Sequence, residues 1–156
     1  MLLADLVSAL APLQTSGSLE REITGIQYDS RLVQPGDLFI AISGFIYDGH
    51  DYLVEAATRE ASVPSQLTTI RVADSRRALG AVAAMYLGYP SHQLRVIGVT
   101  GTNGKTTTTF LIESLLRMAG WRTGIVGTVL IRIGDTQLAS IRTTPESLDL
   151  QQLLAK

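Results

Sequence analysis

The feature that most constrains this chain is an apolar segment that enters a glycine-rich turn and then a helix beginning near Lys105. Residues 95–100 are mainly apolar and predict a buried strand, and Gly101 and Gly104 lie in the turn that follows. A strand, a turn and a helix in this order direct backbone N–H groups and the positive end of the helix dipole toward one point. The segment therefore predicts a phosphate-binding loop in an α/β protein.

The residues at the start of this helix fit a nucleoside triphosphate. Lys105 can reach the β- and γ-phosphates, and the hydroxyl group of Thr106 can ligate Mg²⁺. A tight turn with a surface lysine is the structural alternative, but a lysine in the first helical turn opposes the dipole unless an anion lies there. We therefore predict that Lys105 is catalytic and that Thr106 binds the metal. The residues expected to bind ATP are Gly101, Thr102, Asn103, Gly104, Lys105, Thr106 and Thr107.

The composition excludes several classes of protein. The 156 residues are 46% hydrophobic and 17% charged, which excludes an intrinsically disordered chain. The formal net charge of -1 offers no basic surface for nucleic acid, and the absence of cysteine excludes disulfides and thiolate chemistry. The first residues lack the pattern of a signal peptide, and no apolar run is long enough to span a membrane. We expect a cytoplasmic α/β protein.

Helix and turn signals divide the chain into two modules, residues 1–90 and residues 91–156. The last helix of the first module is followed by Gly88 and Pro90, which are typical of a helix end. The elements expected in the first module are helices over 2–10, 52–57 and 76–87 and extended segments over 23–28, 38–42 and 69–72. The elements expected in the second module are strands over 95–100, 124–127, 129–133 and 138–141 and helices over 106–119 and 145–156. Thr143 or Thr144 is expected to cap the last helix, with Pro145 at its first position.

The spacing of the loop differs from the standard P-loop pattern, in which four residues separate the first glycine from Gly-Lys. Here five residues separate Gly98 from Gly104, and only two separate Gly101 from Gly104. The string from Gly98 to Thr107 resembles the ATP loop of the Mur ligases and of their folylpolyglutamate synthetase relatives. These enzymes join an amino acid to a carboxylate at the expense of ATP.

Further motifs resemble one branch of the Mur ligases, the enzymes that add the third residue of the peptidoglycan stem peptide. They are Asp29-Ser30-Arg31, residues 35–41, Gly44, Asp48-Gly49, Gly127-Thr128 and Thr143-Thr144-Pro145. The resemblance implies an α/β fold with a small UDP-binding domain in residues 1–90. It also implies that residues 91–156 are the truncated start of a P-loop ATPase domain with a mainly parallel sheet.

The same resemblance implies a substrate and the residues that contact it. The substrate is UDP-N-acetylmuramoyl-L-alanyl-D-glutamate, and its uracil would face Tyr28 and Ser30. The other implied contacts are Phe45, Ile46 and Tyr47 along the UDP, and Arg142, Thr143 and Thr144 at the sugar–peptide portion. From the residues alone, a helix N-cap is the simpler interpretation of residues 144–146.

The reaction implied by the resemblance is a ligation that uses ATP and Mg²⁺. ATP phosphorylates the substrate carboxylate, and the amine of meso-diaminopimelate or L-lysine then attacks the acyl phosphate. Two other functions stay open. They are another Mur-like ligase, such as the enzyme that adds D-Ala-D-Ala, and a non-catalytic module that binds a nucleotide or a UDP-sugar. The sequence decides neither the third amino acid nor the oligomeric state.

The chain is expected to be an inactive N-terminal piece of such an enzyme. Only 49 residues follow Thr107, whereas a P-loop domain needs several parallel strands joined by crossovers of ~30 residues each. The acidic Mg²⁺ ligand, the carbamylated lysine and the C-terminal domain of the family have no counterpart among these residues. We therefore expect that this chain alone does not catalyse ligation.

Overall fold

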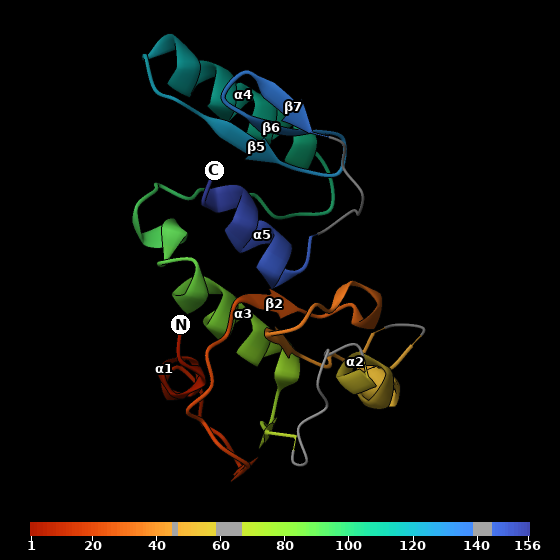
Figure 1. Ribbon diagram of the computed structural model, residues 1–156. Helices are drawn as coiled ribbons and strands as arrows, with labels where there is room; N and C mark the ends of the chain where they lie inside the picture. Colours follow the sequence, from red (N-terminus) through yellow and green to blue (C-terminus); the bar gives the residue numbers. More distant parts are fainter. Residues whose placement is uncertain (45–46, 59–66, 139–144) are drawn as a thin grey trace. The chain divides into compact units, whose positions relative to one another are not determined.

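The structure is a computed structural model that describes residues 1–44, 47–58, 67–138 and 145–156. The chain forms two compact units, Met1–Tyr89 and Pro90–Lys156. Both units combine short helices with small sheets (Figure 1). The α/β fold class predicted from the sequence is confirmed.

The core of the first unit lies where helix α1 (Leu3–Ser8) packs against helix α3 (Ser75–Tyr86). Apolar residues at helical spacing face this contact, and Leu6, Leu79 and Val82 are fully buried. The amphipathic patterns that predicted these two helices therefore supply an apolar core.

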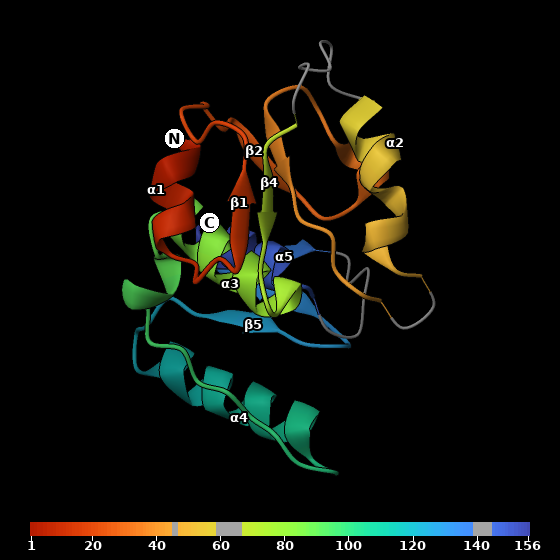
Figure 2. The same ribbon diagram turned by 90° about the horizontal axis from the view of Figure 1, so that it is seen from below.

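Two pairs of short strands are described in the first unit. β2 (Gly25–Gln27) and β3 (Asp37–Phe39) are parallel neighbours. β1 (Gln14–Ser16) and β4 (Thr69–Arg71) are antiparallel and lie side by side in Figure 2. Because β2 and β3 run in the same direction, the segments that follow them leave the same edge of the pair.

Short helices occupy these two following segments. The 3₁₀ helix η1 (Ser30–Leu32) follows β2, and η2 (Gly49–Tyr52) continues into α2 (Leu53–Thr58) after β3. α2 contacts η1 and buries Ala56. The segments after β2 and β3 are therefore held next to each other.

The described part of the second unit contains a three-stranded sheet and two α-helices. Its elements are η3 (Pro90–His92), α4 (Lys105–Met118), β5 (Gly124–Val126), β6 (Ile131–Ile133), β7 (Thr136–Leu138) and α5 (Ser147–Leu154). The strands are antiparallel in the order β5-β6-β7, and α4 packs against β5 (Figure 1). Gly134, with φ of 56°, turns the chain between β6 and β7 as predicted. No helix in the described part of the chain has the length and apolar character to cross a membrane.

The strand predicted over residues 95–100 is absent, and this prediction is wrong for the structure. Val96 and Ile97 are 62% and 57% exposed, and these residues form no strand. The expected mainly parallel sheet is also not found in the described part of the second unit, where all strand pairs are antiparallel. An apolar run predicts a strand, but a strand forms only by pairing with a neighbour. None of the described segments pairs with this run.

The last helix begins later than predicted. Glu146 is the N-cap residue of α5, and Pro145, which was expected inside the helix, precedes it. The carboxylate of Asp149 accepts a hydrogen bond from the Glu146 N–H at 3.2 Å, which is one half of a capping box and sets the helix start. The expected caps, Thr143 and Thr144, lie outside the described residues.

Candidate functional site

The predicted phosphate loop lies at the start of α4 and is exposed along its length. Gly101 and Gly104 have φ angles of 142° and 74°, in the left-handed region that favours glycine. Gly104 is the N-cap residue of α4, and no side chain caps this helix. The N–H groups of the first turn therefore lack the acceptor that a capping side chain supplies. An anion at the loop can accept hydrogen bonds from them.

The ammonium group of Lys105 folds back over this loop. Its Nζ atom donates to the carbonyl oxygen of Gly101 at 2.6 Å and to that of Thr102 at 3.5 Å. Within the described residues, no carboxylate forms an ion pair with Lys105. Its positive charge is therefore kept at the loop and is not neutralised by a neighbouring acid.

The threonines after Lys105 differ in what their hydroxyl groups contact. Thr109 donates to the carbonyl oxygen of Lys105 at 2.9 Å, whereas Thr106 and Thr107 are exposed and their hydroxyl groups hydrogen bond to no described residue. The described ranges also hold no group of three His, Cys, Asp or Glu side chains that could bind a metal alone. Mg²⁺ typically uses few protein ligands together with substrate phosphates. The Thr106 hydroxyl therefore fits a metal ion that arrives with a nucleotide.

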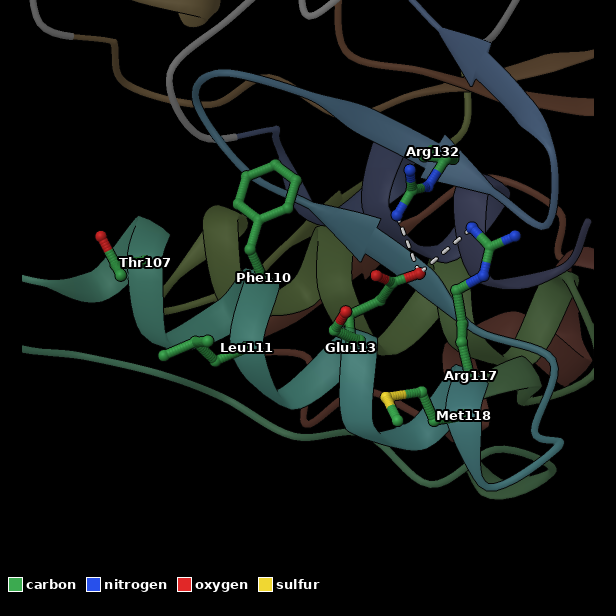
Figure 3. Close-up of a pocket in the computed structure, with 8 residues that line it drawn as sticks. Thr107, Phe110, Leu111, Glu113, Arg117, Met118 and Arg132 are labelled. Atoms are coloured by element: carbon green, nitrogen blue, oxygen red, sulfur yellow. Dashed lines mark ion pairs between the residues drawn. The ribbon is translucent and has the colours of Figure 1, made fainter.

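Two turns after the loop, Glu113 is 6% exposed and is the single buried residue of α4. Figure 3 shows its carboxylate between Arg132 of β6 and Arg117 of α4. These three residues line an open cleft of about 600 Å³. The Oε1 atom of Glu113 lies 2.8 Å from a guanidinium nitrogen of Arg132 and 3.6 Å from one of Arg117. The hydroxyl of Thr123 donates to the same oxygen at 2.8 Å. We refer to Glu113, Thr123 and Arg132 as the helix clamp.

The surroundings of Glu113 keep its carboxyl group ionised. Burial by itself raises the pKa of this group, but the hydrogen bond from Thr123 and the charges of Arg132 and Arg117 lower it by more. The net pKa of Glu113 is therefore below its ordinary value. Arg117 also forms an ion pair with the exposed Asp135 at 3.1 Å. The buried carboxylate is thus balanced by two cations that belong to different elements.

Two residues predicted to face the uracil lie directly after β2. Ser30 is buried at the start of η1, and Tyr28 is half-buried between β2 and η1. Between them, a carboxylate oxygen of Asp29 accepts from the Arg31 N–H at 3.1 Å and from its Nε at 2.8 Å, which fixes this turn. The carboxyl ends of parallel strands are where α/β proteins usually place ligands.

Tyr47 follows β3 in the chain and is 69% exposed. The Gly44 N–H donates to the Tyr47 carbonyl oxygen at 2.9 Å, and the Ser43 hydroxyl donates to Asp48 at 3.2 Å. Hydrogen bonds from the backbone and ring of His50 lower the pKa of the Asp48 carboxyl group. The described residues on either side of Tyr47 are therefore hydrogen-bonded to one another, and they follow β3 as Tyr28 follows β2.

The other predicted substrate contacts lie outside the described residues. They are Phe45, Ile46, Arg142, Thr143 and Thr144.

The helix clamp was not predicted from the sequence, although two signals pointed to it. Glu113 interrupts an apolar helical run, and Arg132 stands between two isoleucines of a strand. Each charge by itself reads as a surface residue. Only the packing of α4 on the sheet brings them within ion-pair distance.

Two family models match this chain. The model described as the Mur ligase middle domain matches residues 99–156, and the model described as the Mur ligase family catalytic domain matches residues 22–63. The first match contains most of the phosphate loop and all of α4, and the second contains β2, η1 and β3. Both models describe the Mur ligase family, which is the family that this chain matches.

Within that family, this chain is similar to proteins named UDP-N-acetylmuramoyl-L-alanyl-D-glutamate–2,6-diaminopimelate ligase. The relative from Syntrophomonas wolfei is 44% identical over 164 residues, which cover 99% of this chain and 34% of the relative. The relative from Clostridium perfringens is 39% identical over 162 residues, which cover 98% of this chain and 34% of the relative. The chain therefore spans about one third of the length of these relatives.

Solved structures of Mur ligases share the fold. A UDP-N-acetylmuramoyl-L-alanyl-D-glutamate–2,6-diaminopimelate ligase matches with a TM-score of 0.70 at 23% identity, over 99% of this chain and 33% of that protein. The D-alanyl-D-alanyl-adding ligase from Acinetobacter baumannii matches with a TM-score of 0.58 at 23% identity, over 99% of this chain and 33% of that protein. The MurF ligase from Thermotoga maritima, solved in complex with ADP, matches with a TM-score of 0.51 at 26% identity, over 86% of this chain and 29% of that protein.

Proposed function

We propose that this chain supplies the UDP-substrate domain, residues 1–90, and the first part of the ATP-binding domain, residues 91–156, of an ATP-dependent ligase. The ligase adds 2,6-diaminopimelate to UDP-N-acetylmuramoyl-L-alanyl-D-glutamate in peptidoglycan synthesis. The observation that carries the proposal is the start of α4, where uncapped N–H groups, the Lys105 ammonium and the Thr106 hydroxyl meet at one exposed loop. Most of this loop lies within the match to the Mur ligase middle domain.

The loop residues act on the phosphates of ATP. The N–H groups of the first helical turn hold phosphate oxygens, and Lys105 neutralises charge on the phosphoryl group that is transferred to the substrate carboxylate. To do so, the Lys105 ammonium exchanges the carbonyl oxygens of Gly101 and Thr102 for phosphate oxygens. Thr106 holds Mg²⁺, which supplies further positive charge when it is bound with the nucleotide.

The edge formed by β2 and β3 holds the UDP end of the substrate. Tyr28 and Tyr47 supply aromatic faces on which a base can stack, and Ser30 supplies a hydroxyl group. Phe45 and Ile46 continue this surface along the UDP in the proposal. Arg142, Thr143 and Thr144 contact the sugar–peptide portion. This last assignment rests on the resemblance of their sequence alone.

The names of the relatives support 2,6-diaminopimelate over L-lysine as the third residue, because relatives 39% and 44% identical to this chain carry that name. The ligases that add D-Ala-D-Ala share the fold and are the alternative within the family. They differ in the UDP substrate, since they extend a tripeptide and not a dipeptide. A test of the substrate therefore separates the two branches.

Nucleotide binding is tested by titrating the 156-residue chain with ATP and Mg²⁺ in a calorimeter. Lys105→Ala is expected to weaken binding strongly, because it removes the charge aimed at the phosphates. Lys156→Ala is the matched control, since it removes the only other lysine of the chain and leaves the loop intact. Equal affinities for the two variants would refute the role of Lys105.

The UDP end is tested by NMR on the same chain. UDP at millimolar concentration is expected to shift the resonances of residues 28–31 more than those of His92. Equal shifts, or none, would contradict the assignment of this edge.

Ligation is tested with a chimera that joins this chain to the remaining two thirds of the Syntrophomonas wolfei relative. We expect phosphate release that depends on UDP-N-acetylmuramoyl-dipeptide and is lost in Lys105→Ala, whereas the 156-residue chain alone is inactive. Release with the tripeptide substrate in place of the dipeptide would favour the D-Ala-D-Ala branch. Nucleotide and UDP binding without any turnover in the chimera would favour a non-catalytic binding module.

A further inference from the structure

Helix α4 is attached to its unit in an unusual way for an amphipathic helix. Its single buried residue is Glu113, while Leu111, Leu115 and Met118 are exposed. The half-buried positions Thr109, Phe110 and Leu116 lie three or four residues from Glu113 and therefore on the same side of the helix. The side of α4 that faces the sheet therefore has a carboxylate at its most buried point.

The contacts of this carboxylate are directional. One oxygen of Glu113 accepts a hydrogen bond from Thr123, just before β5, at 2.8 Å. The same oxygen forms an ion pair with Arg132 of β6 at 2.8 Å, which Figure 3 shows. Apolar contacts tolerate small rotations of a helix, whereas a hydrogen bond and an ion pair lose strength when the geometry changes. The helix clamp therefore fixes how far α4 is turned about its own axis.

That rotation decides where the phosphate loop residues point. Thr106 and Glu113 are seven residues apart, so they lie on the same side of the helix and about 10 Å apart along it. With side chains about 5 Å from the axis, a rotation of about 20° moves the Thr106 hydroxyl by about 2 Å. A misplacement of this size is enough to disrupt a metal or phosphate contact.

We propose that the helix clamp is a positioning device for the nucleotide site: Glu113, held by Arg132 and Thr123, orients α4 so that Thr106 faces the Mg²⁺ of a bound nucleotide. The inference rests on the proposed nucleotide-binding function of the loop. Glu113 does not touch the nucleotide in this proposal. It acts through the rotation of the helix.

The first test measures how much Mg²⁺ increases the affinity of the 156-residue chain for ATP. Glu113→Gln keeps the size of the side chain and removes its charge, and we expect it to reduce this increase about tenfold. Affinity for ATP without Mg²⁺ should change little, because the backbone N–H groups and Lys105 remain. An unchanged Mg²⁺ effect in folded Glu113→Gln would overturn the proposal.

The control is Leu148→Ala, which removes a buried apolar side chain of α5 in the same unit and leaves the clamp intact. It should lower the melting temperature and preserve the Mg²⁺ effect. If Leu148→Ala reduced the Mg²⁺ effect as much as Glu113→Gln, general destabilisation would explain both and the proposal would fail. If Glu113→Gln does not fold, Thr123→Val removes one clamp hydrogen bond and should give a smaller loss in the same direction.

A second measurement needs no nucleotide. The amide and methyl resonances of Thr106 should shift in Glu113→Gln and stay in place in Leu148→Ala, because only the first variant leaves α4 free to turn about its own axis. Absence of that shift overturns the positioning role even if nucleotide binds. Failure of the unmodified chain to bind ATP, together with the expected shift, would refute the proposed function and leave the clamp in place.

Discussion

Helices α3 and α4 are similar in length and are held in place by different forces. α3 buries four apolar residues and is capped by the side chain of Asp74, which accepts from Arg77 at 2.9 Å. α4 buries one carboxylate and is capped by a glycine that offers no side-chain acceptor. Apolar burial supplies stability without direction, whereas a buried ion pair supplies direction at a cost in desolvation. Helix α3, in the core of the first unit, is held by apolar burial. Helix α4, which presents the phosphate loop, is held by an ion pair of fixed direction.

The two units can be followed separately by their own fluorescence. Trp121 is the single tryptophan and lies in the second unit, where the guanidinium group of Arg95 is 4.7 Å from the centre of its ring. All tyrosines belong to the first unit: Tyr28, Tyr47, Tyr52, Tyr86 and Tyr89. Tyrosine emission therefore reports the unit of α3, and tryptophan emission reports the unit of α4.

The largest effect on stability is expected from Leu79→Ala in α3. Leu79 is fully buried, and its truncation leaves a cavity that should lower the free energy of unfolding of the first unit by about 4 kcal/mol. Urea unfolding followed by tyrosine emission measures it. A loss below about 1 kcal/mol would show that the apolar face of α3 is not what stabilises the first unit.

A slightly smaller loss is expected from Arg132→Met in the second unit. The variant removes the cation and leaves the Glu113 carboxylate buried, which should cost about 3 kcal/mol in tryptophan-monitored unfolding. Adding Glu113→Leu should recover part of this loss, because it removes a buried carboxylate that keeps only the longer ion pair with Arg117. If the double variant were less stable than Arg132→Met, the penalty would not come from the loss of the Arg132 counterion to the buried carboxylate.

Acid should weaken the second unit through Glu113. Because the pKa of Glu113 is lowered from its ordinary value of 4.5, its ionised form stabilises the folded state. This contribution is complete above that ordinary value and is lost as the pH falls through the lower folded value. The tryptophan-monitored free energy of unfolding should thus fall more steeply below pH 4.5 in the unmodified chain than in Glu113→Gln. Parallel curves for the two proteins would contradict the role of this carboxylate.

The smallest effect is expected from Leu115→Ala on the exposed side of α4. Leu115 is 66% exposed, so its truncation should change the free energy of unfolding by no more than about 0.5 kcal/mol. The same leucine-to-alanine change costs several times more at Leu79, which makes these two variants a matched pair. A loss at Leu115 as large as that at Leu79 would erase the contrast between the two helices.

The local elements of this chain follow from its sequence. The helices α1, α3 and α4 form where the apolar spacing predicted them, and the turn at Gly134 joins two strands as expected. The loop motif and its unusual glycine spacing also led to the Mur ligase family, which the family matches support. These features are short in range, because a turn or a helix depends on residues within a few positions of each other.

The contacts between elements were decided only by the tertiary structure. The apolar run over residues 95–100 predicted a strand, yet no described neighbour pairs with it, and Val96 and Ile97 are exposed. Glu113 and Arg132 each read as a surface charge in the sequence, and packing of α4 on the sheet pairs the buried Glu113 with the half-buried Arg132. A strand needs a partner and a buried charge needs a counterion. Whether each requirement is met depends on residues far away in the chain. The sequence therefore determines the loop and the helix, whereas the tertiary structure determines the contacts that hold them in place.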